Sequence, residues 1–342
     1  MPITFEAVSF SYNPPTKRQI KAGQTPKYAL KDVSFSLQEG EFLAIAGHTG
    51  SGKSTLTQHF NGLAHPNKGR VLWNGKNLAD KKTANEARGD IGLVFQYPEH
   101  QLFAASVFED VAFGPRNLGL SASEVEERVR KALDQVNLSF EDLKDVSPFE
   151  LSGGQQRRVA FAGVLAMQPS VLILDEPVAG LDPASREDFL TLIEGFHASG
   201  LTVVMVSHNM NDIARLADRV LVMNKGEIAF LGSPEEVFGH AKELREIGLG
   251  VPHAVKLANE LKELGFSLDD KLYQPASLAD DIAKALSAGS ATGGSTASST
   301  TSATAGSVEG SATDFSEGSA IDPATDSSEV PATGTTESGE AS

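Results

Sequence analysis

One eight-residue stretch of the sequence has the residues needed to hold a nucleoside triphosphate. It reads GHTGSGKS over residues 47–54, between an apolar run at residues 42–46 and a helix predicted over residues 55–61. Its glycines let the backbone curl so that successive N–H groups point at phosphate oxygens. The Lys53 ammonium group can reach the β- and γ-phosphates, and the Ser54 hydroxyl can ligate Mg²⁺. A phosphate-binding loop is therefore expected, with contacts from Gly47, His48, Thr49, Gly50, Ser51, Gly52, Lys53, Ser54 and Thr55.

A pair of acidic residues ends a second apolar run. Asp175 and Glu176 directly follow residues 171–174, which are typical of a buried parallel strand. At the carboxyl end of such a strand, Asp175 can hold Mg²⁺ and Glu176 can polarise a water for attack on the γ-phosphate. On these two residues alone, a solvated acidic strand end is an equally good interpretation.

Two further motifs could add to such a site. Residues 151–155, LSGGQ, open a helix predicted over residues 156–167, so their backbone N–H groups could bind an anion. Ser152 could equally be an ordinary helix N-cap. His208 follows a predicted strand at residues 202–206, although a lone histidine is more often structural.

The elements around these motifs indicate an α/β chain with a helical insertion. An Asn-Gly pair at residues 74–75 predicts a hairpin with a type I′ turn. Ser121 with Glu124 predicts a capping box inside a helical insertion at about residues 98–165. Beyond it, strands and helices alternate, which favours a parallel sheet covered by helices. Strands are predicted at residues 3–10, 30–37, 42–46, 69–73, 76–78, 171–174, 202–206 and 219–223, and helices at 183–199 and 210–216.

The whole chain divides into three predicted parts. A nucleotide-binding domain is expected to span residues 1–238 and to include a capping box at Ser233. A helical appendage is expected at 239–287, with helices over 252–264 and 278–286, Gly265 as C-cap and Ser277 as N-cap. Ser, Thr, Gly and Ala dominate from residue 288 onward, with eight acidic residues and no Lys or Arg, so residues 288–342 are predicted to be a disordered acidic tail.

Composition sets limits on partners and compartment. The 342 residues include 40% hydrophobic residues and no cysteine, so a sizeable core is possible and disulfides are excluded. We expect no secretory signal and no membrane-spanning segment. The formal net charge of −16 divides into −8 for the tail and −8 for residues 1–287. Neither part has the basic footprint of a nucleic-acid binder.

The order and spacing of these motifs resemble an ABC-type ATPase: the phosphate loop, Gln96, LSGGQ, Asp175-Glu176, Asp182 and His208 follow one another in register. The resemblance implies an α/β fold with a parallel core sheet, an antiparallel β subdomain, the helical insertion and the C-terminal appendage. It implies ATP and Mg²⁺ as ligands, with Ser54, Gln96 and Asp175 at the metal. It also implies a head-to-tail pair of ATPase subunits, in which one subunit's ATP meets the other's signature residues, Leu151, Ser152, Gly153, Gly154 and Gln155.

The same resemblance assigns the remaining roles. Glu176, His208 and Gln96 would be catalytic, and Asp182 would communicate across the dimer. The adenine would stack on an early aromatic residue, for which Tyr12 matches best while Tyr28 stays possible.

Longer segments narrow the resemblance to the energy-coupling factor (ECF) transporter ATP-binding subunits. They lie at residues 58–63, 94–103, 113–117, 207–212 and 247–252. The resemblance implies a peripheral protein on the cytoplasmic face of the cell membrane. Its partners would be a second ATPase subunit, identical or not, a transmembrane coupling protein and a substrate-binding membrane protein that import a vitamin or a transition-metal ion. The alternatives are a subunit of another ABC transporter and a soluble ABC ATPase such as a cluster-assembly factor.

The residues after Gln96 are the expected contact with the membrane partner. Tyr97, Glu99, Leu102 and Phe103 would line a groove between the α/β core and the insertion. In the ECF resemblance the docking helix carries an arginine, for which Glu99 is the candidate partner. The alternative is that Glu99 is an ordinary surface acid.

Overall fold

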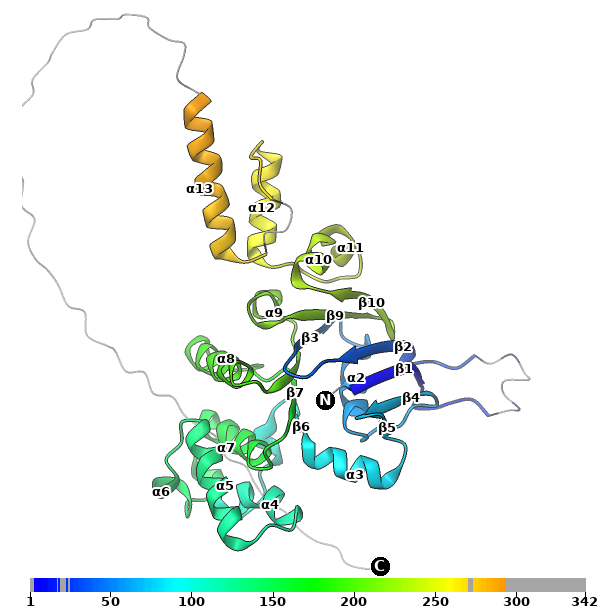
Figure 1. Ribbon diagram of the computed structural model, residues 1–342, viewed down its shortest axis with the longest axis vertical. Coiled ribbons are helices and arrows are strands. Elements are labelled where there is room, and N and C mark those ends of the chain that lie inside the picture. The colour runs from blue at the N-terminus through cyan, green and yellow to red at the C-terminus, as the bar shows by residue number, and fades with distance from the viewer. Residues whose placement is uncertain (1–2, 17, 19–22, 24, 270–272, 293–342) are drawn as a thin grey trace, which may run out of the picture. The chain divides into compact units, whose positions relative to one another are not determined.

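The computed structural model describes residues 3–16, 18, 23, 25–269 and 273–292. Its central element is a six-stranded sheet in the order β10-β9-β3-β8-β7-β6 (Figure 1). The strands β3, β6, β7, β8 and β9 are parallel, and β10 is antiparallel to β9. Their bounds are Phe42–Gly47 for β3, Ile91–Val94 for β6, Val171–Asp175 for β7, Thr202–Val206 for β8, Arg219–Asn224 for β9 and Glu227–Gly232 for β10. Every residue of β3, β7 and β8 is buried, as expected for parallel strands covered on both faces.

A second, antiparallel sheet has the order β2-β1-β4-β5. Its strands are β1 (Ile3–Phe10), β2 (Leu30–Leu37), β4 (Lys68–Trp73) and β5 (Lys76–Asn77). Asn74 and Gly75 both have positive φ, 52° and 75°, so the predicted hairpin turn between β4 and β5 is confirmed. Phe5 packs edge-to-face on Phe60 of α2 (Lys53–Phe60), which joins this sheet to the phosphate-loop helix.

The helical insertion shares one hydrophobic core with the central sheet, where its buried residues cluster with Leu172, Leu174 and Val203. It contains η1 (Pro98–Gln101), α4 (Val107–Asn117), α5 (Ala122–Gln135), α6 (Phe140–Leu143), η2 (Pro148–Glu150) and α7 (Gly153–Leu165). Val125, Val129 and Leu133 form the buried stripe of α5, and the capping box of Ser121 and Glu124 is present as predicted. The helix α3 (Lys81–Asp90) was not predicted, because only Thr83, Ala84 and Ala87 are buried along it.

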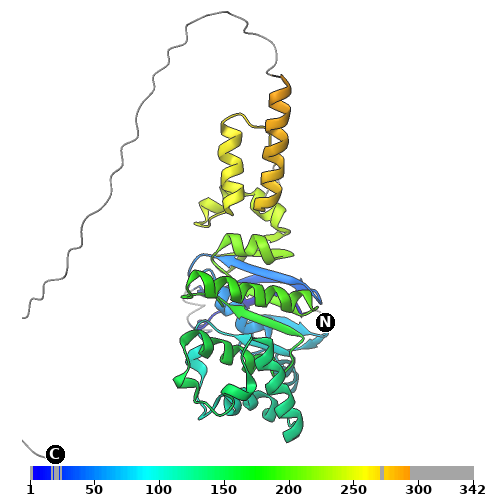
Figure 2. The same cartoon turned by 90° about the vertical axis from the view of Figure 1, so that its left-hand side faces the viewer.

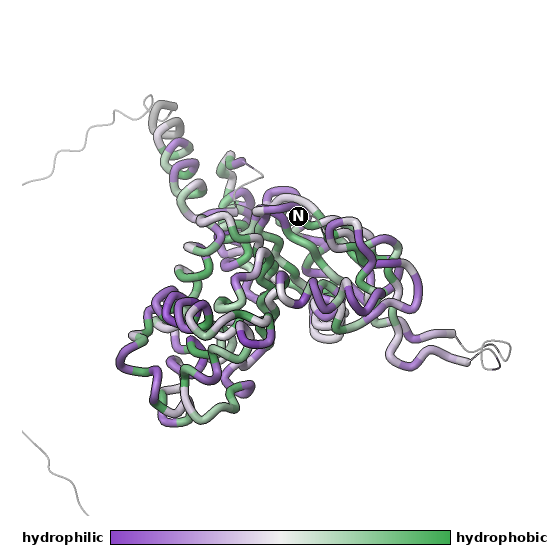
Figure 3. Tube along the Cα trace, turned by 60° about the horizontal axis from the view of Figure 1, so that its bottom comes forward, coloured by the Kyte–Doolittle hydropathy of each residue, from purple (hydrophilic) through white to green (hydrophobic). Residues whose placement is uncertain are grey.

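The remaining helices follow the core strands and then extend beyond them. They are α8 (Pro183–Ala198), α9 (Met210–Leu216), α10 (Pro234–Gly239), α11 (Ala241–Glu246), α12 (His253–Glu263) and α13 (Pro275–Thr292). Ser233 caps α10 with the predicted capping box. Figure 2 shows α12 and α13 side by side, where Ala254, Ala258 and Leu278 form a small core. Figure 3 shows hydrophobic and hydrophilic positions alternating along α13. Residues 1–294 cluster as one compact unit.

The last helix corrects one prediction. The sequence predicts a helix over residues 278–286 with Ser277 as N-cap, but α13 begins at Pro275 and ends at Thr292. Ser277 therefore lies inside the helix, and α13 continues past residue 288, where the tail was expected to begin. Pro is well suited to the first position of a helix, which explains the earlier start. The rest of the predicted tail, residues 293–342, lies outside the described residues.

Candidate active site

The phosphate loop is a cradle whose backbone only glycine can form. Gly47 and Gly52 have φ values of 156° and 108°. A Cβ atom at Gly47 would lie 2.4 Å from Ser51 Oγ and 2.6 Å from the carbonyl oxygen of Met223, and one at Gly52 would lie 2.5 Å from the carbonyl oxygen of Ala29. The Ser51 hydroxyl is buried and has no hydrogen-bond partner among the described residues. This glycine-rich polar turn fits a ligand rich in acceptor oxygens.

Lys53 is the buried cation of the cradle. The helix α2 begins at this residue, two positions earlier than predicted, so its amino end faces the loop. The Lys53 Nζ donates to the carbonyl oxygens of Gly47 at 2.7 Å and His48 at 3.2 Å. Burial lowers the pKa of Lys53, and the nearby Glu176 and Asp175 carboxylates counteract that effect. Two carbonyl oxygens of the phosphate loop therefore hold the Lys53 ammonium group in place.

Asp175 lies beside this cation at the end of β7. Its side chain is buried and shares a hydrogen bond with Ser54, and burial raises the pKa of the carboxyl group. Because a cation favours the ionised form, a metal ion next to Asp175 and Ser54 would offset the cost of burial. The described residues hold no cluster of three or more His, Cys, Asp or Glu suited to a metal ion. Mg²⁺ in nucleotide sites takes few protein ligands, so the oxygens of Ser54 and Asp175 fit it.

Glu176 is held from two sides. Its Oε1 lies 2.5 Å from His208 Nε2, and its Oε2 accepts a hydrogen bond of 3.2 Å from Gln96 Nε2. These residues follow β7, β8 and β6, so the carboxyl ends of three neighbouring parallel strands bring them together. Glu176 itself has a positive φ of 52°, a conformation that is costly for a residue with a side chain. The arrangement presents a carboxylate of fixed orientation at the mouth of the cradle.

Most of the predicted nucleotide residues line one cavity of about 510 Å³, whereas Gly47, His48, Ser51 and Asp175 do not. Tyr12 is 60% exposed at its edge, and its hydroxyl lies 2.9 Å from Thr55 Oγ1. Tyr28 does not line the cavity. The lining residues are Tyr12, Ala29, Thr49, Gly50, Gly52, Lys53, Ser54, Thr55, Gln96, Glu176 and His208.

The signature residues lie elsewhere in the chain. Ser152 caps α7 and shares a capping box with Gln155, while Ser152, Gly153 and Gly154 are exposed to solvent. Asp182 is the exposed N-cap of α8, where its hydrogen bonds with Ser185 keep the pKa of the carboxyl below its usual value. None of these residues lines the nucleotide cavity. A single chain therefore brings the phosphate loop, Gln96, Glu176 and His208 together and leaves the signature motif apart.

Glu99 was predicted to pair with an arginine of the membrane partner, but within this chain its carboxylate already pairs with Arg157. Arg157 Nη2 lies 2.9 Å from Glu99 Oε1, and Arg157 Nε lies 3.0 Å from Oε2. Their side chains are 5% and 17% exposed. Burial by itself raises the pKa of Glu99, but the hydrogen bonds from Arg157 outweigh it and the pKa lies below its usual value. Each carboxylate oxygen of Glu99 accepts one hydrogen bond from Arg157, and the pairing of Glu99 with an arginine of a membrane partner stays a prediction.

Arg157 is a buried residue beside the site that the sequence did not single out. Besides Glu99, it donates to the carbonyl oxygens of Pro177 at 3.4 Å and Ala179 at 2.9 Å, directly after Glu176. One guanidinium group thus ties the signature helix to the segments that follow Gln96 and Glu176. Helical spacing could have indicated that Arg157 is buried, since it lies one and two turns before the buried Phe161 and Leu165 on the same face of α7.

A groove does lie between the core and the insertion. It encloses about 430 Å³, and α3, α4, α7 and the residues after η1 line it. Of the four predicted contacts, Leu102 and Phe103 line this groove, and Tyr97 and Glu99 do not. Phe103 and Phe113 are 61% and 51% exposed and pack edge-to-face at its rim.

Comparison with known proteins agrees with this geometry. Residues 30–179 match the family model described as ABC transporter. The chain is 58% identical over 269 residues to the energy-coupling factor transporter ATP-binding protein EcfA2 of Symbiobacterium thermophilum, covering 78% of this chain and 91% of that protein. This chain belongs to the energy-coupling factor branch of the ABC ATPases.

Solved ABC ATPases confirm the predicted fold class. The structure of cbiO1 from Clostridium perfringens, part of the ABC transporter complex cbiONQ, aligns with a TM-score of 0.62 and 36% identity, covering 76% of this chain and 98% of that one. A dimeric post-hydrolysis structure of the ATP-binding cassette MJ0796 with ADP and Pi aligns with a TM-score of 0.59 and 30% identity, covering 68% of this chain and 98% of that one. The chain is thus an ABC-type ATPase.

Proposed function

We propose that this chain is the ATP-hydrolysing subunit of an ECF-type importer and works as one half of a head-to-tail ATPase dimer. The observation that carries the proposal is the separation of the two half-sites. The phosphate loop with Gln96, Glu176 and His208 forms one half, and the exposed signature motif, Ser152 to Gly154, forms the other. A second ATPase subunit, identical or not, would bring its signature motif over this chain's cavity. The dimeric relative bound to ADP and Pi supports this arrangement.

Each residue then has a defined task in hydrolysis. The loop and Lys53 bind the phosphates, and Tyr12 stacks against the adenine. Ser54 and Asp175 would hold Mg²⁺, with Gln96 beside them, and the ion would supply positive charge to the phosphates. Glu176 accepts a proton from the attacking water, while His208 and Gln96 fix its carboxylate. Asp182, exposed at the start of α8, contacts the partner subunit.

The remaining partners are membrane proteins. Among the described residues, no helix is both long and apolar enough to cross a membrane. We assign the groove beside Phe103 and Phe113 to a helix of a transmembrane coupling protein, with the ATPase on the cytoplasmic face. The apolar rim and the position between core and insertion support that assignment. A separate substrate-binding membrane protein would select the solute, a vitamin or a transition-metal ion.

Co-purification tests the proposal. Phe103→Asp places a charge on the apolar rim, so recovery of the coupling protein and solute uptake should fall while ATPase activity of the isolated subunit persists. Leu264→Asp is the matched control, since Leu264 is 77% exposed and lies outside the groove. If both variants retain the coupling protein equally, the groove is not its docking site. If the wild-type chain retains no membrane protein at all, the importer assignment fails.

A further inference from the structure

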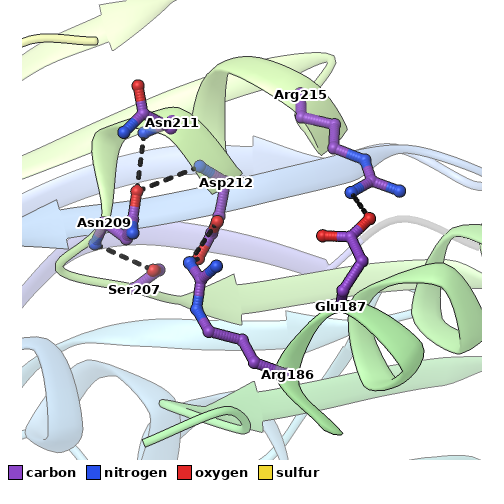
Figure 4. A network of polar contacts seen from close by, with 7 residues as sticks. All are labelled: Arg186, Glu187, Ser207, Asn209, Asn211, Asp212 and Arg215. Carbon is purple, nitrogen blue, oxygen red and sulfur yellow. Dashed lines mark hydrogen bonds and ion pairs between the residues drawn. The ribbon is translucent and has the colours of Figure 1, made fainter. Parts of the chain in front are cut away.

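Three ion pairs join α8 to α9, and they differ in position and burial; Figure 4 draws two of them. Arg186 of α8 hydrogen-bonds both carboxylate oxygens of Asp212 in α9. Farther along the same helices, Arg215 of α9 pairs with Glu187 and with Glu194 of α8. Figure 4 shows the first pair close to the turn that carries Ser207 and Asn209, and the second pair farther from it.

The first pair joins the turns that follow two nucleotide motifs. Arg186 comes four residues after Asp182, and Asp212 comes four residues after His208. The backbone N–H of Arg186 donates to the carbonyl oxygen of Asp182 at 2.9 Å, so Arg186 lies one helical turn from that residue. The ion pair therefore connects the start of α8 with the start of α9.

Hydrogen bonds continue from Asp212 to the backbone on both sides of His208. Asn209 Oδ1 accepts from the backbone N–H of Asp212 at 3.3 Å and from that of Asn211 at 2.9 Å. The Asn209 N–H in turn donates to Ser207 Oγ at 3.1 Å. The backbone of His208 is thereby fixed between two bonded neighbours, with its imidazole 2.5 Å from Glu176.

The Arg186–Asp212 and Arg215–Glu187 ion pairs differ in burial, and we therefore expect them to differ in how strongly they hold the two helices together. The side chains of Asp212 and Arg186 are 6% and 29% exposed, against 57% and 35% for Glu187 and Arg215. Burial raises the pKa of Asp212, and Arg186 counteracts that effect. A buried carboxylate that keeps both oxygens on one guanidinium group holds a defined geometry, whereas exposed pairs contribute little.

We infer that Arg186 and Asp212 are positioning residues for hydrolysis: their ion pair fixes the start of α9 against the start of α8 and so keeps the His208 imidazole on Glu176. The inference rests on the proposed ATP hydrolysis. Neither residue lines the nucleotide cavity, so the pair acts on the catalytic geometry and not on nucleotide binding. Arg215 joins the same helices away from the motifs, through Glu187 and Glu194, which makes Glu187 the control for loss of one exposed ion pair.

Steady-state ATPase assays of the full chain test the inference. We expect Asp212→Asn and Arg186→Gln each to lower kcat roughly tenfold with KM for ATP unchanged. The reason is that His208 would no longer be held against Glu176, while the phosphate loop would keep its structure. The double variant should lose no more than either single variant, since the two residues act as one unit. Arg186→Lys should recover part of kcat, because it restores the charge with a single contact. Glu187→Gln should remain within about twofold of the wild type.

Three results would overturn the inference. The first is an equal loss of kcat in Glu187→Gln, which would mean that breaking any ion pair between α8 and α9 lowers kcat and that Arg186–Asp212 has no special role. The second is a rise in KM without a change in kcat. The third is wild-type kcat in both Asp212→Asn and Arg186→Gln. If Asp212→Asn does not fold, the partly exposed Arg186 still allows the comparison of Gln with Lys at one position. Absence of ATPase activity in the wild-type chain would instead refute the proposed function.

Discussion

The phosphate loop and the signature motif are both glycine-rich turns at the start of a helix, yet their surroundings differ. Around the loop, Lys53 and Asp175 are buried, and Lys53 bonds the carbonyl oxygens of its own turn. At the signature motif, Ser152 and both glycines are exposed, and the Ser152 hydroxyl bonds only within its capping box among the described contacts. The first turn is a finished half-site within one chain. The second is a rigid surface suited to a ligand that another subunit holds.

The largest expected effect comes from the finished half-site. Glu176→Gln keeps the shape of the side chain and a partner for His208, but removes the carboxylate that accepts a proton. We expect kcat to fall by at least about 100-fold while ATP still binds. Gel filtration should show a dimer accumulating with ATP, because hydrolysis no longer separates the subunits. Turnover near the wild-type rate would show that Glu176 is not the base.

The second effect concerns the support behind the exposed signature motif. Glu99→Gln removes the charge that pairs with buried Arg157, so chemical unfolding should show a loss of about 2–4 kcal/mol. Glu109→Gln is the control, because Glu109 also pairs with an arginine, Arg116, but both side chains are about half exposed. That variant should lose less than about 1 kcal/mol. Equal losses in the two variants would mean that the burial of Arg157 has no energetic consequence.

Local patterns predicted most of the site, and distant partners account for the failures. The loop, the strand end at Asp175 and the capping residues Ser121 and Ser233 could be predicted because each depends on neighbours in sequence. Glu99 could not, because its partner lies 58 residues away and only the folded chain brings the two together. The helix α3 was missed for another reason, because its few buried side chains give no helical periodicity. The fully buried strands β3, β7 and β8 were predicted because full burial demands an uninterrupted apolar run. The short strand β6 and the partly exposed strand β10 were missed.

The third prediction tests whether the two half-sites belong to different chains. Ser152→Arg damages the exposed motif, Lys53→Ala damages the loop, and each variant alone should be inactive. A random mixture should recover up to about a quarter of wild-type activity, because half the dimers are mixed and each of those keeps one of two sites intact. Ser123→Arg, at an exposed serine of α5, should stay active. A mixture as inactive as its parents, with mixed dimers shown by cross-linking, would refute the head-to-tail arrangement.

The smallest expected effect concerns the edge of the finished half-site, where Tyr12 is exposed and its hydroxyl contacts Thr55. Tyr12→Ala removes a ring that would stack on the adenine, and calorimetry should show roughly tenfold weaker ATP binding. Tyr12→Phe loses only the hydroxyl contact with Thr55, so its affinity should fall less than about threefold.

Tyr28→Ala completes this test, because Tyr28 is partly buried and does not line the cavity. ATP affinity should stay at the wild-type value in that variant, since no stacking surface is lost. If Tyr28→Ala instead weakens binding while Tyr12→Ala does not, the adenine lies on the other tyrosine. The finished half-site would then extend into the loop that precedes β2. Equal weakening by both alanine variants would place the base between the two rings and would contradict the assignment to Tyr12 alone.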